Sequence, residues 1–188
     1  SRKPWVAGFV VRDLSERIGS GPADTNLPDY LSKHQIPTLI GADTRALTRH
    51  IRDVGAMRAI LAHDGISPKV ALERLKDEPQ MQGRNLATAV STKDSYELGP
   101  SDPEIDHGLV LGLDYGVKLR SLDLIRREGY RVRVVPCDTS VEVLLEADPQ
   151  GVFVSNGPGD PEAVPGAVER IRSLSDAGVP IFGICLGH

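Results

Sequence analysis

From residue 108 to the end of the chain, short apolar runs alternate with amphipathic segments. Each run has the length and apolar content of a buried strand, and each intervening segment places its apolar residues on one helical face. The expected strands are residues 108–116, 130–136, 151–157 and 179–185, and the expected helices are residues 118–129, 138–149 and 162–178. Strands that alternate with helices predict parallel βαβ units with right-handed crossovers. We therefore expect an α/β fold here, with a doubly wound, mainly parallel sheet.

The first half of the chain predicts a mixed α/β domain. The expected strands are residues 5–11, 36–41 and 56–62, and the expected helices are residues 26–34, 43–55 and 67–78. Asn26, Asp43 and Ser67 stand where helix N-cap residues belong. In the second half, Thr139 and Glu142 have the spacing of a capping box, which would open the helix expected over residues 138–149.

The segment between these two halves is polar. Residues 92–107, TKDSYELGPSDPEIDH, carry Pro, Gly, Ser and Asp, which is typical of a linker or an exposed excursion. This composition places a domain boundary near residue 100. We expect a first domain over residues 1–100 and a second domain over residues 107–188.

Composition and charge narrow the class of protein. The formal net charge is −4 and no dense block of Lys or Arg occurs, so nothing supports a nucleic-acid surface. No apolar run approaches the roughly 20 residues that cross a bilayer, and residues 1–13 lack the apolar stretch of a signal peptide. The two cysteines, Cys137 and Cys185, do not resemble a disulfide framework, so a reducing cytoplasm is the simplest interpretation.

The end of the last expected strand carries the first candidate for chemistry. Residues 183–187, GICLG, have the glycine–x–nucleophile–x–glycine form of an elbow, in which a strand turns sharply into a helix. Cys185 would then project from the carboxyl end of a parallel strand, where open α/β sheets bind ligands, at a helix N-terminus that favours a thiolate. The N–H group of Leu186 is a candidate donor to an oxyanion. The alternative is that Cys185 is a small buried hydrophobic residue.

A second candidate follows an earlier strand. Residues 155–161, SNGPGDP, form a tight loop whose free N–H groups could face a substrate or an oxyanion. An ordinary βα turn is the alternative. His188 could be drawn into a dyad with Cys185, but the elbow residue points away from the following helix, so we expect His188 to be an ordinary first-turn residue. Cys137 is expected to be structural.

The remaining charged and histidine residues suggest little chemistry. None of the other histidines shows metal-ligand spacing; they are His34, His50, His63 and His107. Arg45, Arg49 and Arg52 are expected to form a solvated helix face, with a contact surface for an acidic partner as the alternative.

With both motifs placed, the chain resembles a known family. SNGPGDP followed by FGICLGH resembles the class I (triad) glutamine amidotransferases. GFVVRDLS and YLSKHQIPTLIGADTRALTRHIRDVGAMRAIL are similar to the small, glutamine-hydrolysing subunits of carbamoyl phosphate synthetase. The resemblance covers nearly the whole chain and is weakest over residues 92–107.

The resemblance implies a role for each matching residue. Cys185 would attack the side-chain amide of glutamine and form a glutamyl thioester. Leu186 and Gly157 would donate backbone N–H groups to the oxyanion, and Gly157, Gly159 and Leu186 would line the glutamine pocket. Ammonia would pass to a large synthetase subunit, which makes carbamoyl phosphate for pyrimidine and arginine synthesis. No metal or cofactor is implied for the small subunit, because ATP and magnesium would bind the large one; no nucleic acid or membrane partner is implied.

The resemblance also implies parts that the sequence lacks. The family's general base is a histidine well downstream, supported by a glutamate, and the first domain would begin before residue 1. We therefore expect an internal piece of a longer glutaminase, inactive or nearly so alone. A sheet left uncovered on one face predicts marginal stability or oligomerisation.

Two other functions stay open at this point. The chain could be a non-catalytic module that binds the large subunit, or a different thiol hydrolase on the same fold, such as a relative of the cysteine peptidases. The NGPGDP loop and the first domain argue against the second of these. Protection of Cys185 from alkylation by glutamine would separate the three functions.

Overall fold

The computed structural model describes residues 4–18, 25–62, 65–81 and 83–188. The chain divides into two compact units, of which the first ends at Met81 and the second ends at His188. This division lies earlier in the chain than the boundary that the sequence predicts near residue 100. The reason is that residues 83–106 make their contacts within the second unit.

The described residues of the second unit form one five-stranded sheet. In their order across the sheet, the strands are β3 (Tyr96–Leu98), β5 (Arg131–Pro136), β4 (Leu109–Asp114), β6 (Gly151–Val154) and β7 (Ile181–Gly183). Neighbours from β5 to β7 run parallel, and β3 runs antiparallel to β5 at the edge. The mainly parallel sheet confirms the fold class predicted from the sequence.

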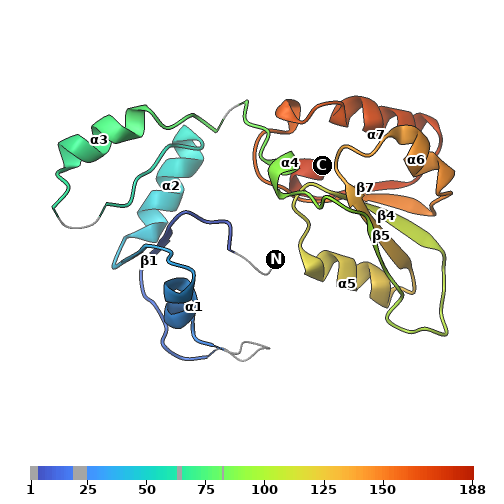
Figure 1. The fold of residues 1–188 in the computed structure, drawn as a ribbon, viewed down its shortest axis with the longest axis horizontal. Coiled ribbons are helices and arrows are strands. Elements are labelled where there is room, and N and C mark those ends of the chain that lie inside the picture. Colours follow the sequence, from blue (N-terminus) through green and yellow to red (C-terminus); the bar gives the residue numbers. More distant parts are fainter. Residues whose placement is uncertain (1–3, 19–24, 63–64, 82) are drawn as a thin grey trace. The chain divides into compact units, whose positions relative to one another are not determined.

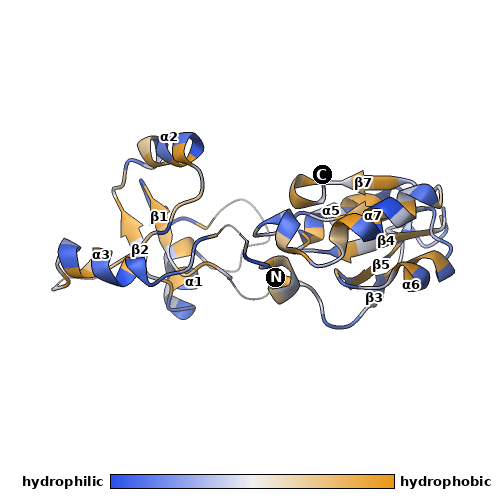
Figure 2. Cartoon of the chain, turned by 90° about the horizontal axis from the view of Figure 1, so that it is seen from above, coloured by the Kyte–Doolittle hydropathy of each residue, from blue (hydrophilic) through white to orange (hydrophobic). Residues whose placement is uncertain are grey.

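Helices flank this sheet on both sides (Figure 1). α5 (Leu119–Arg127) lies on one side, and α6 (Val141–Glu146) and α7 (Ala167–Asp176) lie on the other. The buried side chains form two clusters to match: one contains Leu122, Val132, Val134 and Phe153, and the other contains Leu111, Leu113, Leu144, Val152, Val154 and Leu174. Figure 2 shows the strands as mainly hydrophobic. Strands covered on both faces have continuous apolar runs, which is why the sequence predicts them.

The edge strand β7 is less covered by helices than the central strands of the sheet. Phe182 is 65% exposed, although its ring stacks on that of the buried Phe153 with 6.2 Å between centroids. An open apolar depression lies beside it, lined in part by Ile125 and Tyr130. Part of one face is therefore uncovered, as expected; the marginal stability or oligomerisation that would follow stays a prediction.

The segment expected to be a linker belongs to the sheet. Residues of β3 pair with β5, Tyr96 opposite Val134 and Leu98 opposite Val132. Just before β3, the backbone N–H of Thr92 donates to Oδ2 of Asp114 at 2.8 Å. The prediction of a linker is therefore wrong for residues 96–98, because they form the edge strand β3.

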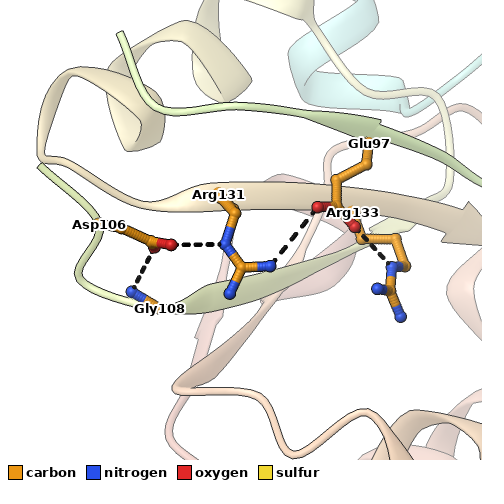
Figure 3. Close-up of polar contacts among 5 residues, drawn as sticks. All are labelled: Glu97, Asp106, Gly108, Arg131 and Arg133. Atoms are coloured by element: carbon orange, nitrogen blue, oxygen red, sulfur yellow. Dashed lines mark hydrogen bonds and ion pairs between the residues drawn. The ribbon is translucent and has the colours of Figure 1, made fainter. Parts of the chain in front are cut away.

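Ion pairs fasten β3 to β5 on one face of the sheet (Figure 3). Arg133 Nε donates to Glu97 Oε2 at 3.0 Å, and Arg131 Nη1 lies 3.5 Å from Glu97 Oε1. Arg131 also donates through Nε to Asp106 Oδ2 at 2.9 Å, while Oδ1 of Asp106 accepts the Gly108 N–H at 2.9 Å. Glu97 and Asp106 thus hold both arginines of β5 to the chain that precedes β4.

Asp106 gives this edge a predicted pH dependence. The Gly108 N–H, together with the Arg131 guanidinium, holds the pKa of the Asp106 carboxyl below its ordinary value. A lowered folded-state pKa means that the carboxylate stabilises the fold above its unfolded-state pKa and loses this effect as the pH falls through the folded-state pKa. We expect Asp106→Asn to be less stable than wild type above about pH 5, with the difference shrinking in more acidic solution. Urea unfolding across this range measures it, and a difference independent of pH would contradict it; Asp102→Asn is the control.

Two details of the second unit differ from the sequence prediction. The capping box of Thr139 and Glu142 does not form, since Ser140 is the N-cap residue of α6. The Thr139 hydroxyl donates instead to the carbonyl oxygen of Pro136 at 2.8 Å. The helix expected over residues 162–178 is a 3-10 turn, η1 (Pro161–Ala163), followed by α7. Pro165 and Gly166 separate the two.

The first unit is a small mixed α/β arrangement, as predicted. β1 (Phe9–Val11) and β2 (Thr38–Ile40) pair in parallel, and the helices are α1 (Leu27–Lys33), α2 (Thr44–Val54) and α3 (Pro68–Lys76). The predicted caps are confirmed: Asn26 Oδ1 accepts the Asp29 N–H at 2.8 Å, and Asp43 Oδ1 accepts the Ala46 N–H at 2.9 Å. The Ser67 hydroxyl accepts the Val70 N–H at 3.4 Å.

The strand predicted over residues 56–62 is wrong, since these residues form no strand. Their alternating pattern is real, but no neighbouring strand pairs with them. Arg58 instead donates through Nη1 to the carbonyl oxygens of Lys76 and Glu78, at 3.0 and 2.9 Å, at the end of α3. The arginines of α2 are exposed, as expected for a solvated face; they are Arg45, Arg49 and Arg52.

Candidate functional site

Three loops leave the carboxyl ends of adjacent parallel strands. β4 leads to Tyr115, β6 leads to Ser155, and β7 leads to Ile184 and Cys185. Pairing of Val154 with Gly183 sets the last two loops side by side. β4 lies between β5 and β6. The crossover through α5 packs on one face of the sheet and the crossovers through α6 and α7 pack on the other, so the carboxyl ends of these strands form a topological switch point. Ligands of doubly wound sheets bind at such points.

Cys185 lies on a sharp turn directly after β7. Its φ is +56°, a left-handed conformation that few residues other than glycine adopt. The Ile184 N–H donates to the Val154 carbonyl oxygen at 3.1 Å, and the His188 N–H donates to the Cys185 carbonyl oxygen at 3.0 Å. The side chain is exposed, so Cys185 is not the buried hydrophobic residue of the alternative interpretation. The turn is the elbow that the sequence predicts.

The two glycines that frame Cys185 are required by contact with backbone. A Cβ atom at Gly183 would overlap the carbonyl oxygen of Gly187. A Cβ atom at Gly187 would overlap the carbonyl oxygen of Val154, in the neighbouring strand. Neither carbonyl can move without disturbing the turn or the sheet. The glycine spacing in the sequence therefore has the steric cause that the elbow interpretation proposes.

Directly after β7, the residues Cys185–Gly187 form a 3-10 turn, η2. In the part of the chain that the structure describes, the backbone N–H groups of Leu186 and Gly157 donate no hydrogen bond. Both groups follow the carboxyl ends of the paired strands β6 and β7. They are therefore available to an acceptor from outside, such as an oxyanion.

The loop of Ser155–Asp160 is tied to the end of β4. The buried Ser155 hydroxyl accepts the Tyr115 N–H at 3.0 Å and donates to the Asn156 carbonyl oxygen at 2.9 Å. Asn156 Nδ2 donates to the Gly116 carbonyl oxygen at 2.9 Å. A Cβ at Gly157 would overlap the carbonyl oxygen of Tyr115, so only glycine fits there. This loop is more constrained than an ordinary βα turn.

Asp114, the last residue of β4, is a structural residue that the sequence motifs do not indicate. Its carboxylate is buried and accepts three backbone N–H groups, from Thr92 at 2.8 Å, Gly116 at 2.9 Å and Val117 at 2.8 Å. It thereby fixes the turn after β4 and joins it to the segment before β3. An aspartate at the end of an apolar strand, two residues before a glycine, was the available signal.

Tyr115 and Cys137 belong to the core behind the loops. Burial raises the pKa of the Tyr115 phenol, and the nearby Arg170 guanidinium opposes this effect. Arg170 is itself buried and donates through Nε to the Thr139 carbonyl oxygen at 2.7 Å. Cys137 is buried, its N–H donates to the Ser91 hydroxyl at 3.0 Å, and its Sγ lies 3.7 Å from the Thr88 hydroxyl. The prediction that Cys137 is structural fits this position.

Histidines and metals add nothing to this site in the described residues. There, no side chain forms a hydrogen bond with Cys185 Sγ, and the contact of His188 with Cys185 is through backbone atoms. Across residues 4–18, 25–62, 65–81 and 83–188, no group of three or more His, Cys, Asp or Glu could hold a metal ion. His63 lies outside this range. Within it, no helix is long and apolar enough to cross a membrane.

Comparisons with known proteins agree with both halves of the chain. Residues 111–188 match the family model "Glutamine amidotransferase class-I", and residues 1–61 match "Carbamoyl-phosphate synthase small chain, CPSase domain". Over its whole length, the chain is 42% identical to the carbamoyl phosphate synthase small chain of Thermosynechococcus vestitus and 40% identical to that of Pseudomonas putida. It covers 52% and 53% of these relatives, so it spans about half their length. Along its whole length, the chain is thus similar to part of the carbamoyl phosphate synthase small chains.

Proposed function

We propose that the protein is the glutamine-hydrolysing component of a carbamoyl phosphate synthase. The observation that carries this proposal is the exposed thiol of Cys185, held at a φ of +56° between two glycines that no other residue can replace. A nucleophilic residue with a left-handed backbone conformation, at the carboxyl end of a parallel strand, is the arrangement of an elbow. The similarity of residues 111–188 to class I glutamine amidotransferases supports the side-chain amide of glutamine as the substrate.

The proposed reaction has two steps. The Cys185 thiolate attacks the side-chain carbonyl carbon of glutamine, and the negative charge that develops on its oxygen is stabilised by the N–H groups of Leu186 and Gly157. The C–N bond then breaks, ammonia leaves with an added proton, and a thioester remains. Water hydrolyses the thioester to glutamate and restores the thiol. In this proposal, Gly157, Gly159 and Leu186 line the pocket for glutamine. The protons are carried by a general base, and none of the described residues lies at Cys185 in a position to act as that base.

The proposed fate of the ammonia rests on the resemblance of the chain to the small subunits of carbamoyl phosphate synthetase. A small chain implies a large synthetase subunit, and we propose that ammonia passes to it through the protein. There it would combine with bicarbonate at the expense of ATP, giving carbamoyl phosphate for pyrimidine and arginine synthesis. ATP and magnesium would bind the large subunit, and the small chain would need no metal or cofactor of its own.

Protection of Cys185 by glutamine tests this function. We expect L-glutamine to slow the alkylation of Cys185 by iodoacetamide about tenfold at saturation, because bound substrate covers the thiol. Mass spectrometry of the labelled peptide separates Cys185 from the buried Cys137. D-glutamine is the matched control, since it has the same charge and size. Equal rates with and without L-glutamine would contradict the proposal and would favour a module that only binds a partner.

A further inference from the structure

The second half of the SNGPGDP loop is held by a segment that lies far away in the sequence. Asp160 Oδ2 accepts the backbone N–H of Gly83 at 3.2 Å, across 77 residues of chain. The Asp160 N–H donates in return to the Arg84 carbonyl oxygen at 3.4 Å. Two hydrogen bonds in opposite directions thus join the loop to residues 83–84.

Gly159 lies against the same segment. Its φ is +90°, and a Cβ atom there would lie 2.8 Å from the Arg84 carbonyl oxygen and 3.1 Å from the Leu86 backbone nitrogen. Residues 83–86 therefore form a backbone wall behind the loop. Because Gly159 already touches this wall, the loop cannot move toward it, and the Asp160 carboxylate prevents it from moving away.

Asp160 also determines how the chain leaves the loop. Its Oδ1 accepts the Glu162 N–H at 3.0 Å, so the same carboxylate caps η1. At the other end of the loop, Ser155 and Asn156 bind the turn after β4. Gly157, whose N–H group is free, lies between these two anchors.

We propose that Asp160 is a positioning residue for glutamine hydrolysis, acting by holding the Gly157 and Gly159 backbone against the wall of residues 83–86. This inference rests on the proposed function and adds a residue to it. Asp160 does not touch the substrate; it acts through the direction of the loop N–H groups. Displacing such groups by a fraction of an ångström weakens a reaction that depends on them and leaves the thiol itself unchanged.

Two electrophiles of different shape separate positioning from general stability. Iodoacetamide reports on the Cys185 thiol alone. A chloromethyl ketone analogue of L-glutamine alkylates the same sulfur, with a C–S bond formed and chloride released, but it must also bind as glutamine does. The ratio of the two rates therefore measures how well the loop is placed for a glutamine-shaped molecule.

Asp160→Asn is the variant that removes one of the two carboxylate acceptors. With Oδ1 kept as the acceptor that caps η1, the NH2 group faces the Gly83 N–H, so that two donors oppose each other. We expect the chloromethyl ketone to react about tenfold more slowly, with the iodoacetamide rate and the thermal midpoint unchanged. Glu162→Ala is the matched control, because it removes one negative charge two residues away.

Three other results would each overturn the inference. An unchanged chloromethyl ketone rate in Asp160→Asn would show that the contact does not position the loop. Equal slowing of both reagents with a lowered thermal midpoint would show a structural role only. If the wild-type chain reacted equally with the L and D forms of the chloromethyl ketone, the proposed glutamine site itself would be wrong.

Discussion

Replacing Cys185 with Ser is expected to abolish labelling of the chain by the chloromethyl ketone analogue of L-glutamine, with a rate loss of about 100-fold or more. Cys185 is the exposed cysteine of the two and the nucleophile of the proposed reaction, whereas Cys137 is buried. A hydroxyl at this position would be far less nucleophilic than a thiol near neutral pH. The measurement is the intact mass of the chain after timed exposure to the reagent.

Cys137→Ser is the matched control for this prediction. It makes the same sulfur-to-oxygen change, but at a buried cysteine whose Sγ lies 3.7 Å from the Thr88 hydroxyl. We expect its labelling rate to equal that of wild type. Labelling that persisted in Cys185→Ser, or that disappeared in Cys137→Ser, would show that the reactive group is not the one on the elbow.

Gly187→Ala is expected to destabilise the second unit by about 2 to 4 kcal/mol and to remove the reactivity of Cys185 with the chloromethyl ketone, while iodoacetamide still alkylates the thiol. The new methyl group would overlap the carbonyl oxygen of Val154, which is part of the sheet. To make room, either the hydrogen bond from the Ile184 N–H to Val154 must break or the turn after Cys185 must open. Both changes displace the thiol from its position at the strand end.

Gly99→Ala is the control that separates this clash from a general effect of alanine for glycine. No atom lies within 4 Å of the position that its Cβ would occupy. We expect its free energy of unfolding to stay within about 0.5 kcal/mol of wild type. Urea unfolding followed by circular dichroism measures both variants, and a Gly187→Ala variant as stable and as reactive as wild type would contradict the steric account of the elbow.

The sequence predicts the central strands well because each carries its own signal. The strands β4 and β6 are apolar runs covered on both faces, and a glycine follows closely after each of them, Gly116 and Gly157. The elbow is equally local, because Gly183 and Gly187 have a direct steric relation to the turn that holds Cys185. Patterns of this kind need no knowledge of the rest of the chain.

What the sequence does not predict depends on contacts between distant residues. β3 contains Tyr96 and Glu97, both exposed, and it becomes a strand because β5 offers it an edge and Arg133 pairs with Glu97. Residues 56–62 have the alternating pattern of a strand, but in the described part of the chain they pair with no strand. Asp114 looks like an ordinary residue at a strand end and Asp160 like an ordinary loop aspartate, and only the structure places their partners, Thr92 and Gly83, next to them.

The site residues divide along the same line. The position of Cys185 on an exposed turn is confirmed, while the catalytic and binding roles of Cys185, Gly157, Gly159 and Leu186 stay predictions. The available N–H groups of Gly157 and Leu186 support these roles. The residues that hold those groups in place, Ser155 and Asp160, are not predicted from the sequence. Their hydrogen-bond partners lie 40 and 77 residues away along the chain.

The position of β4 in the middle of the sheet bears on how the unit folds. β4 and β5 pair across the single helix α5, and this short crossover lets them come together early, since little chain entropy is lost in closing it. The contact between Gly83 and Asp160 spans 77 residues and needs β6 to be in place first. A refolding chain would therefore bury most of its core before its thiol faces an ordered loop, so reactivity would return later than compactness.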